Sequence, residues 1–225
     1  MRRITAASLG IPQPLAVAVG EGIGISRRLI EHPSALATIG GVIRRTVSDD
    51  INEPWWNKRA IRYLSRLVRP GDRVFEWGSG GSTVWLTRQG ATVTSVEHDP
   101  EWVARVRELC PTADVVAIPS APAGALRSEA QLIHTGHRYF DDYVAAIDSI
   151  AVGSLDIVIV DGFCRIECTR RAAPKVRPGG VLIIDDTDFR FLRPQRLLAG
   201  WRAVALSGFK PRFELRETTF FHKPT

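Results

Sequence analysis

Cysteines are few in this chain, and no apolar run is long. The 225 residues include three cysteines, Cys110, Cys164 and Cys168, an odd number without a C-x-x-C pair. A disulfide framework is therefore not expected, and we expect a reducing, cytoplasmic setting. Two prolines and Glu21 interrupt the apolar stretch near the first residue well before it reaches the length of a membrane span. The sequence thus predicts no transmembrane helix.

Blocks of like charge and low-complexity tracts are also absent. The net charge of +6 permits contact with nucleic acid or acidic lipid. The basic residues are scattered, however, and no RNA-binding motif is readable. Arg170, Arg171, Lys175 and Arg177 fit a solvated helix face. The sequence therefore gives no reason to expect a nucleic-acid partner.

The length suits one α/β domain with an N-terminal extension. Residues 1–50 form the predicted extension, and 23–47 has arginines beside apolar positions, as in one or two amphipathic helices. Two interpretations stay open. The extension packs on the sheet or on a second subunit as a dimer contact, or it docks on a membrane surface. Residues 51–225 are predicted to form the main domain.

Three β-branched runs lack clean alternation, namely VTSV at 93–96, DIVIV at 156–160 and VLII at 181–184. Such runs are typical of strands buried on both faces of a parallel sheet that is covered by helices. Asp99 is the predicted N-cap of a helix that has Pro100 at its first position. The sequence predicts strands at 73–77, 92–97, 113–118, 155–160, 180–185, 202–207 and 215–222, and helices at 56–68, 81–89, 100–110, 139–151 and 166–173.

A glycine-rich turn, FEWGSGGST at 75–83, follows the first predicted strand and opens a helix. Gly78, Gly80 and Gly81 allow the backbone to approach a ligand where side chains would collide. The next strand ends in Glu97, whose carboxylate can accept hydrogen bonds from both hydroxyls of a ribose. Together these features predict a site for a nucleoside cofactor.

The glycine spacing discriminates between cofactors. A dinucleotide fingerprint counted from Gly78 would need Gly or Ala at Thr83, so the turn does not fit NAD. Glu76 lies two residues before Gly78, where an acid suits a cationic ligand better than a pyrophosphate. S-adenosylmethionine carries an ammonium and a sulfonium and fits this pattern.

With VDG at 160–162 and PGGVLIIDD at 178–186 in the same order, the sequence resembles the class I S-adenosylmethionine-dependent methyltransferases, in their small O-methyltransferase-like branch, over roughly 54–223. The resemblance implies a Rossmann-like α/β sheet of seven strands, one of them antiparallel, with helices on both faces. It also implies S-adenosylmethionine as the cofactor. The residues expected to bind it are Glu76, Gly78, Ser79, Gly80, Ser82, Glu97, His98, Ser120, Asp161 and Phe163.

Three acids end neighbouring predicted strands. Asp161 follows DIVIV, and Asp185 and Asp186 follow VLII. The resemblance to catechol O-methyltransferase and its relatives implies that these acids hold Mg²⁺ or another divalent cation, which would lower the pKa of an acceptor hydroxyl. The alternative stays open that Asp161 faces the cofactor or the acceptor, and that the other two cap a segment or hold Arg165 or Arg190.

The lysine base of the metal-dependent relatives is missing, because Cys164 stands three positions after the first acid. Candidate bases are Asp161 itself and two histidines of a long connection, His134 and His137. Arg165 is a candidate for binding an anionic part of the acceptor. The sequence thus predicts O-methylation of a small-molecule or glycosyl hydroxyl. One alternative is a cofactor-binding partner or scaffold without turnover. Another is an RNA methyltransferase, but the lysine that RNA ribose methyltransferases carry in this strand is absent from VLIIDD.

Overall fold

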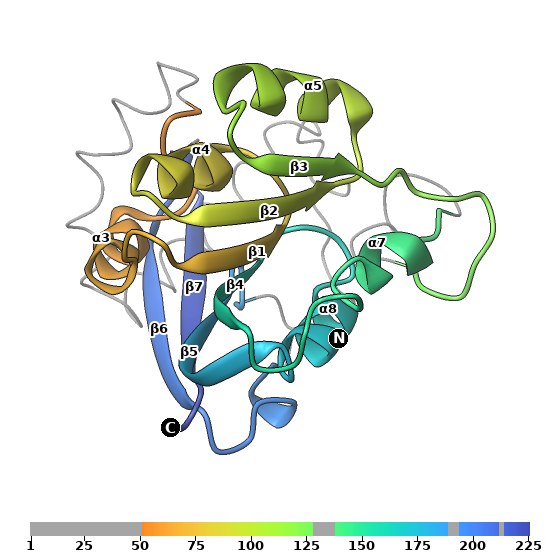
Figure 1. Cartoon of the computed structure of the whole chain (residues 1–225). Helices are drawn as coiled ribbons and strands as arrows, with labels where there is room; N and C mark the ends of the chain where they lie inside the picture. Colours follow the sequence, from red (N-terminus) through yellow and green to blue (C-terminus); the bar gives the residue numbers. More distant parts are fainter. Residues whose placement is uncertain (1–50, 128–137, 189–193, 212–213) are drawn as a thin grey trace, which may run out of the picture.

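A computed structural model of the chain describes residues 51–127, 138–188, 194–211 and 214–225 (Figure 1). The predicted extension 1–50, with its helices at 23–47, lies outside these residues. His134, His137 and Arg190 lie outside them as well.

A seven-stranded sheet forms the centre of the molecule, in the order β3-β2-β1-β4-β5-β7-β6. β7 runs antiparallel to both β5 and β6, whereas the pairings among β1 to β5 are parallel. This order and the single antiparallel strand confirm the predicted Rossmann-like fold. The strands are β1 Arg73–Trp77, β2 Thr92–Glu97, β3 Asp114–Ala117, β4 Leu155–Val160, β5 Val176–Ile184, β6 Arg202–Phe209 and β7 Leu215–His222.

Helices cover both faces of the sheet (Figure 1). Successive residues of β4 show why the apolar runs are continuous: Ile157 and Ile159 pack with α3 and α4, and Val158 and Val160 pack with α7 and α8. Both faces of a central parallel strand are thus withdrawn from water. The helices are α3 Lys58–Leu67, α4 Gly81–Arg88, α5 Pro100–Leu109, α7 Asp141–Ala145 and α8 Arg165–Ala172, with a short 3₁₀ helix at Pro194–Arg196.

Asp99 caps α5 as predicted, since its side chain accepts from the backbone N–H groups of Glu101 and Trp102. The helix predicted at 139–151 is wrong in extent. After Ala145 the chain turns more tightly, with Asp148 N donating to Ala145 O over 2.8 Å and Ile150 N to Ile147 O over 3.1 Å. These hydrogen bonds join residues three positions apart, as in a 3₁₀ helix, instead of the four of an α-helix. The α-helix α7 therefore ends at Ala145.

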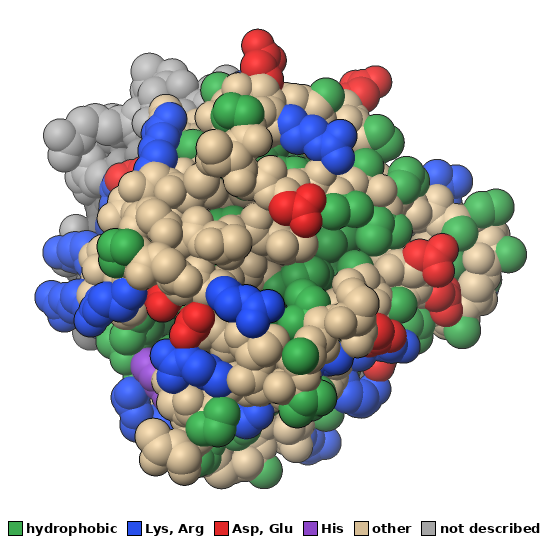
Figure 2. Space-filling model, in the orientation of Figure 1, with side chains coloured by type: hydrophobic (Ala, Val, Ile, Leu, Met, Phe, Trp, Pro, Cys, Tyr) green, Lys and Arg blue, Asp and Glu red, His purple; other side chains and the backbone are tan. Residues whose placement is uncertain are grey.

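β5 begins four residues before its predicted start and passes through Pro178 and Gly179. An irregularity in its pairing with β4 accommodates this segment. Among the described residues, no helix combines the length and the apolar composition needed to cross a membrane. On the face seen in Figure 2, Lys and Arg side chains lie in several separate groups, some of them beside Asp or Glu.

The carboxyl ends of β1, β2, β4 and β5 meet at one edge of the sheet. Backbone hydrogen bonds join them: Gly78 N donates to Val96 O over 2.9 Å, and Asp161 N donates to Trp77 O over 3.0 Å. The segments that follow these strands are therefore held side by side, which is where ligands bind in open α/β sheets.

Candidate active site

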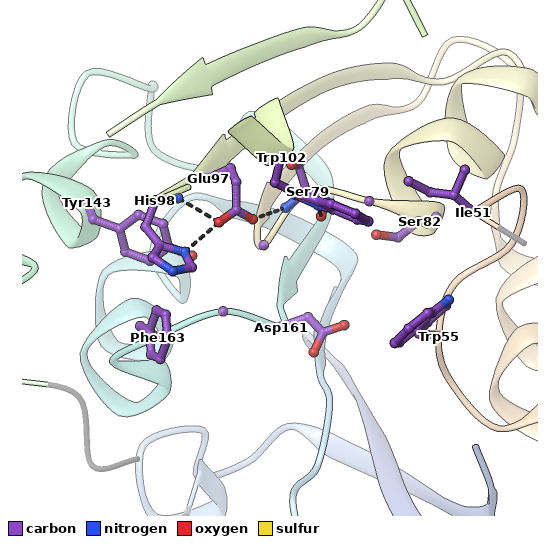
Figure 3. A pocket seen from close by; sticks show the side chains of 14 residues that line it. Ile51, Trp55, Ser79, Ser82, Glu97, His98, Trp102, Tyr143, Asp161 and Phe163 are labelled. Atoms are coloured by element: carbon purple, nitrogen blue, oxygen red, sulfur yellow. Dashed lines mark hydrogen bonds and ion pairs between the residues drawn. The ribbon is translucent and has the colours of Figure 1, made fainter. Parts of the chain in front are cut away.

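A pocket of about 330 Å³ opens at this edge of the sheet (Figure 3). This is within the usual size range of small-molecule sites. Its lining comes from the glycine turn, the ends of β2 and β4, the start of α5, α7 and the segment before α3. The residues are Ile51, Trp55, Gly78, Ser79, Gly80, Gly81, Ser82, Glu97, His98, Trp102, Tyr143, Asp161, Gly162 and Phe163.

Gly78 makes the close approach of two strand ends possible. Its φ of +94° lies in the left-handed region. A Cβ atom at Gly78 would lie 2.7 Å from the carbonyl oxygen of Asp161, closer than real contacts allow. Only glycine therefore fits between the turn after β1 and the turn after β4.

Glu97 lines the pocket at the end of β2 and is 5% exposed. One carboxylate oxygen, Oε2, accepts from Ser79 N over 3.0 Å. The other, Oε1, accepts from the backbone N–H groups of His98 and Asp99 over 2.7 and 3.1 Å. These amides fix the carboxylate beside the glycine turn. The lone pair that remains on Oε2 is suited to a ligand hydroxyl.

Glu76 does not line the pocket, which corrects its predicted place at the cofactor. Its carboxylate is fully buried and accepts from Ser82 Oγ over 2.7 Å and from Thr83 Oγ1. Thr83 Oγ1 in turn accepts from Gly80 N over 2.9 Å. Burial raises the pKa of Glu76 to about 7, although the hydrogen bonds from neighbouring hydroxyl groups act to lower the pKa. Glu76 thus holds the turn and the start of α4 from beneath.

Aromatic rings form one end of the pocket. Figure 3 shows His98 and Phe163 at this end and Trp55 at the other, with Asp161 between them. The rings of His98 and Phe163 meet edge to face with centroids 4.5 Å apart. Ser120, which we expected here, is outside the lining, and its hydroxyl accepts from Arg138 Nε over 3.0 Å.

Trp102 and Tyr143 line the pocket, although neither was predicted to do so. Trp102, on α5, donates from Nε1 to Ser79 O over 2.7 Å, and its place in the first turn after the Asp99 cap was a usable signal. Tyr143 lies on α7, and no sequence pattern ties it to Gly162, which it contacts. The hydroxyl group of Ser79 has no hydrogen-bond partner among the described residues. A polar ligand in the pocket would supply one.

Asp161 is held in a fixed orientation at the end of β4. Its Oδ2 accepts from Trp56 Nε1 over 2.8 Å, and its Oδ1 lies 3.6 Å from Arg165 Nη2. Burial raises the pKa of Asp161, although the charges of Lys210 and Arg165 oppose the increase. Trp55, which is 41% exposed, lines the pocket on the same side.

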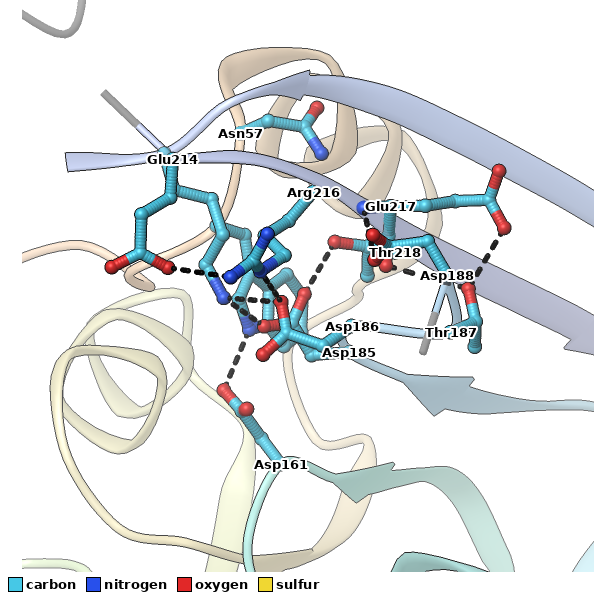
Figure 4. A network of polar contacts seen from close by, with 12 residues as sticks. Asn57, Asp161, Asp185, Asp186, Thr187, Asp188, Glu214, Arg216, Glu217 and Thr218 are labelled. Atoms are coloured by element: carbon cyan, nitrogen blue, oxygen red, sulfur yellow. Dashed lines mark hydrogen bonds and ion pairs between the residues drawn. The ribbon is translucent and has the colours of Figure 1, made fainter. Parts of the chain in front are cut away.

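The other two acids face basic side chains (Figure 4). Asp185 is fully buried and accepts from Lys210 Nζ and, over 2.6 Å, from Thr218 Oγ1. Asp186 has a left-handed φ of +53° and accepts from Lys210 Nζ over 2.9 Å. Arg165 Nη1 lies 3.5 Å from the Asp186 carboxylate.

These contacts correct the predicted divalent-cation site at Asp161, Asp185 and Asp186. Burial raises the pKa of Asp185 to about 7. Burial also acts on Asp186, but the charges of Lys210 and Arg165 outweigh it and lower the pKa. The carboxylates already have positive partners, and in the described part of the chain no three Asp, Glu, His or Cys side chains are grouped to hold a metal ion.

No family model and no curated protein matches this sequence. Solved structures do match its fold. An O-methyltransferase from Bacillus cereus, in complex with SAH, is 18% identical with a TM-score of 0.53 over 83% of this chain and 90% of its own. A methyltransferase-like protein from Silicibacter pomeroyi is 24% identical with a TM-score of 0.53, over 78% and 89% of the two chains.

A third similar structure is the 1,6-didemethyltoxoflavin-N1-methyltransferase of Burkholderia thailandensis, with S-adenosylhomocysteine bound. It is 17% identical with a TM-score of 0.50, over 87% of this chain and 90% of its own. At such identities the likeness establishes the fold alone. The chain has the Rossmann-like fold of the class I S-adenosylmethionine-dependent methyltransferases.

Proposed function

We propose that this protein is an S-adenosylmethionine-dependent methyltransferase that methylates a hydroxyl oxygen of a small-molecule or glycosyl acceptor. One observation carries the proposal: a single pocket has the fixed carboxylate of Glu97 near one end and that of Asp161 farther along, across the glycine turn. A ribose-binding acid and an acceptor-side acid are thus within reach of one bound molecule.

The residues present fit the cofactor. Glu97 would accept from a ribose hydroxyl through Oε2, because the backbone amides already hold its carboxylate in place. His98 and Phe163 offer ring surfaces for the adenine. Ser79 would satisfy its unpartnered hydroxyl on a polar group of the ligand.

The bound cofactor would supply an electrophilic methyl group on a sulfonium. Asp161 would then orient the acceptor, with its carboxylate plane fixed by Trp56 and Arg165. The Asp161 carboxylate would take up the proton that the acceptor hydroxyl loses on methylation, and the cofactor would leave as a neutral thioether. A raised pKa makes Asp161 a better base than an exposed aspartate. Holding both reactants in line contributes much of the acceleration.

The acceptor class rests on two features of the acceptor side. Trp55 offers a half-exposed aromatic face beside Asp161, on which a planar ring or the apolar face of a sugar can lie. Arg165 lies close enough to Asp161 to bind an anionic substituent of the same acceptor. A small acceptor with a hydroxyl beside a ring fits these groups.

The experiment is transfer of a radiolabelled methyl group from S-adenosylmethionine to a panel of phenolic, sugar and amine acceptors. We expect label on a hydroxyl acceptor and a loss of about a hundredfold in rate for Asp161→Asn. Asp156→Asn, at the opposite end of β4, is the matched control and should transfer normally.

Two other outcomes of this assay would change the proposed function. Label on amine acceptors alone would move the acceptor atom to nitrogen. Tight cofactor binding without transfer to any acceptor would favour the cofactor-binding partner or scaffold.

A further inference from the structure

We infer that the ammonium of Lys210 is the permanent counter-cation of the acids that end β4 and β5, and that it fills the place a divalent metal would take. Lys210 is then a positioning residue on the acceptor side. Its consequence for catalysis, methyl transfer without a metal ion, rests on the proposed function.

Lys210 reaches the acids from a different part of the sheet. It directly follows β6, and its backbone N donates to Glu214 O over 2.8 Å at the turn toward β7. Its Nζ donates to Asp185 and, over 2.9 Å, to Asp186, so one ammonium bridges two consecutive carboxylates. The Lys210 side chain is 13% exposed and that of Asp185 is fully buried. An ion pair so withdrawn from water is costly to break from one side.

The charges of the neighbouring side chains also disfavour binding of a divalent ion at these acids. The acids Asp161, Asp185 and Asp186 face Lys210, Arg165 and Arg216, whose Nε lies 3.9 Å from Asp186. Arg216 also lies 3.4 Å from Glu214, so Lys210 and Arg165 are the main positive partners of the three acids. A divalent ion would add two positive charges to carboxylates that already have these partners. Such an ion would have to displace Lys210 before it could gain carboxylate ligands.

The influence of Lys210 extends to the pocket. Arg165 connects the two groups, because its Nη2 lies 3.6 Å from Asp161 Oδ1 and its Nη1 lies 3.5 Å from Asp186, which accepts from Lys210 Nζ. Asp161 lines the pocket and Lys210 does not. Lys210 thus acts through the acids, by holding the hairpin of β6 and β7 against them and by stabilising their charge.

Removing the ammonium should leave the Asp185 and Asp186 carboxylates without their shared cation, so that they can rearrange around a divalent ion. The test is a titration of the full, chelator-treated chain with Mn²⁺, with the unbound ion measured by electron paramagnetic resonance. We expect no Mn²⁺ site in the wild type. Lys210→Ala should gain one, at least about tenfold tighter than any wild-type binding, because its carboxylates lose their counter-cation. Asp185→Asn in the same variant should abolish it.

Three further variants control for the loss of a lysine, the loss of packing and the loss of charge. Lys58→Ala removes a lysine that pairs with Glu53 at the surface, and it should gain no Mn²⁺ site. Lys210→Met keeps most of the buried stem without its charge. It should gain the site, and Mn²⁺ should raise its melting temperature while leaving that of the wild type unchanged. Lys210→Arg keeps the charge and should bind no Mn²⁺.

Two results would overturn the inference. One is Mn²⁺ binding to the wild type that Asp185→Asn removes, since the metal would then displace Lys210. The other is a folded Lys210→Ala or Lys210→Met variant without an Mn²⁺ site. If neither variant folds, the wild-type titration alone decides. The readout uses no cofactor and no acceptor, so failure of this inference and failure of the proposed function are separate results.

Discussion

The indole nitrogen of Trp56 donates to Asp161 Oδ2 over 2.8 Å, joining residues that are 105 positions apart in the sequence. Trp56 is fully buried at the start of the segment that leads into α3, whereas Asp161 ends β4 and lines the pocket. This bond ties the acceptor-side carboxylate to the far edge of the sheet, because Asn57, the next residue, donates to Leu206 O of β6 over 2.9 Å. The orientation of Asp161 therefore depends on packing outside the pocket.

Trp56→Phe tests this bond while keeping a buried ring. The carboxylate loses a donor, so we expect a loss of about 1.5–3 kcal/mol in unfolding free energy, measured by urea denaturation. The matched control is Trp77→Phe. Trp77 is also fully buried, but its Nε1 donates over 2.8 Å to a neutral carbonyl, that of Tyr143. Its loss should be smaller, about 0.5–1.5 kcal/mol. A greater loss in Trp77→Phe would contradict the charged bond to Asp161.

Glu97→Ala should weaken cofactor binding. It deletes charge-assisted hydrogen bonds worth about 1.5–3 kcal/mol each before compensation by water. We expect at least about a tenfold loss of S-adenosylhomocysteine affinity by calorimetry. Glu101→Ala removes an acid in the first turn of α5, away from the pocket lining, and should bind normally. Unchanged affinity in a folded Glu97→Ala variant would place the ribose elsewhere.

Gly78→Ala separates steric fit from backbone strain. Gly71 has a similar φ of +87°, but a Cβ there would meet nothing within 4 Å. Gly71→Ala should therefore cost only the left-handed backbone, about 1–2 kcal/mol. Gly78→Ala has the same cost plus its collision with Asp161 O, and we expect a larger loss of stability together with weaker cofactor binding. Equal losses in the two variants, measured by denaturation, would show that the turn does not need the close approach.

The buried acid beneath the turn predicts a pH dependence of stability. The pKa of Glu76 is raised from 4.5 to about 7, so the folded chain keeps a proton that the unfolded chain has released. The contribution of Glu76 to the free energy of unfolding is therefore complete below pH 4.5 and is lost as the pH rises to about 7. The expected loss is on the order of 3 kcal/mol. Glu76→Gln should flatten this part of the stability curve. A curve that keeps its slope in the variant would assign the effect to another group.

The strands were predictable because their residue patterns favour a buried β-strand over other secondary structure. β2 and β4 occupy their predicted positions, since β-branched runs bounded by turn residues are typical of a sheet buried on both faces. The Asp99 cap and the glycine turn are local signals, read from a few neighbouring residues. The extent of α7 was not predictable in this way, because the turn after Ala145 depends on how Ile147 is buried against the sheet.

The clearest site signals lie at strand ends. Gly78 and Asp161 directly follow β1 and β4, Glu97 ends β2, and all three line one pocket. Glu76 was misplaced because alternation along β1 turns its side chain under the loop, where hydroxyl groups hold it. Lys210 was missed for another reason. It comes 25 positions after Asp185, beyond β6, and no pattern in the sequence links a turn residue to an acid on another strand.

Calorimetric titration of the full chain with S-adenosylmethionine, S-adenosylhomocysteine and NAD distinguishes an adenosylmethionine pocket from a dinucleotide pocket. The glycine turn lacks the third glycine of a dinucleotide site, and the pocket has Glu97 for a ribose and Asp161 on the far side of the turn. We predict saturable binding of both adenosyl compounds at one site and no comparable binding of NAD. Binding of NAD as tight as that of S-adenosylhomocysteine, or tighter, would contradict the account.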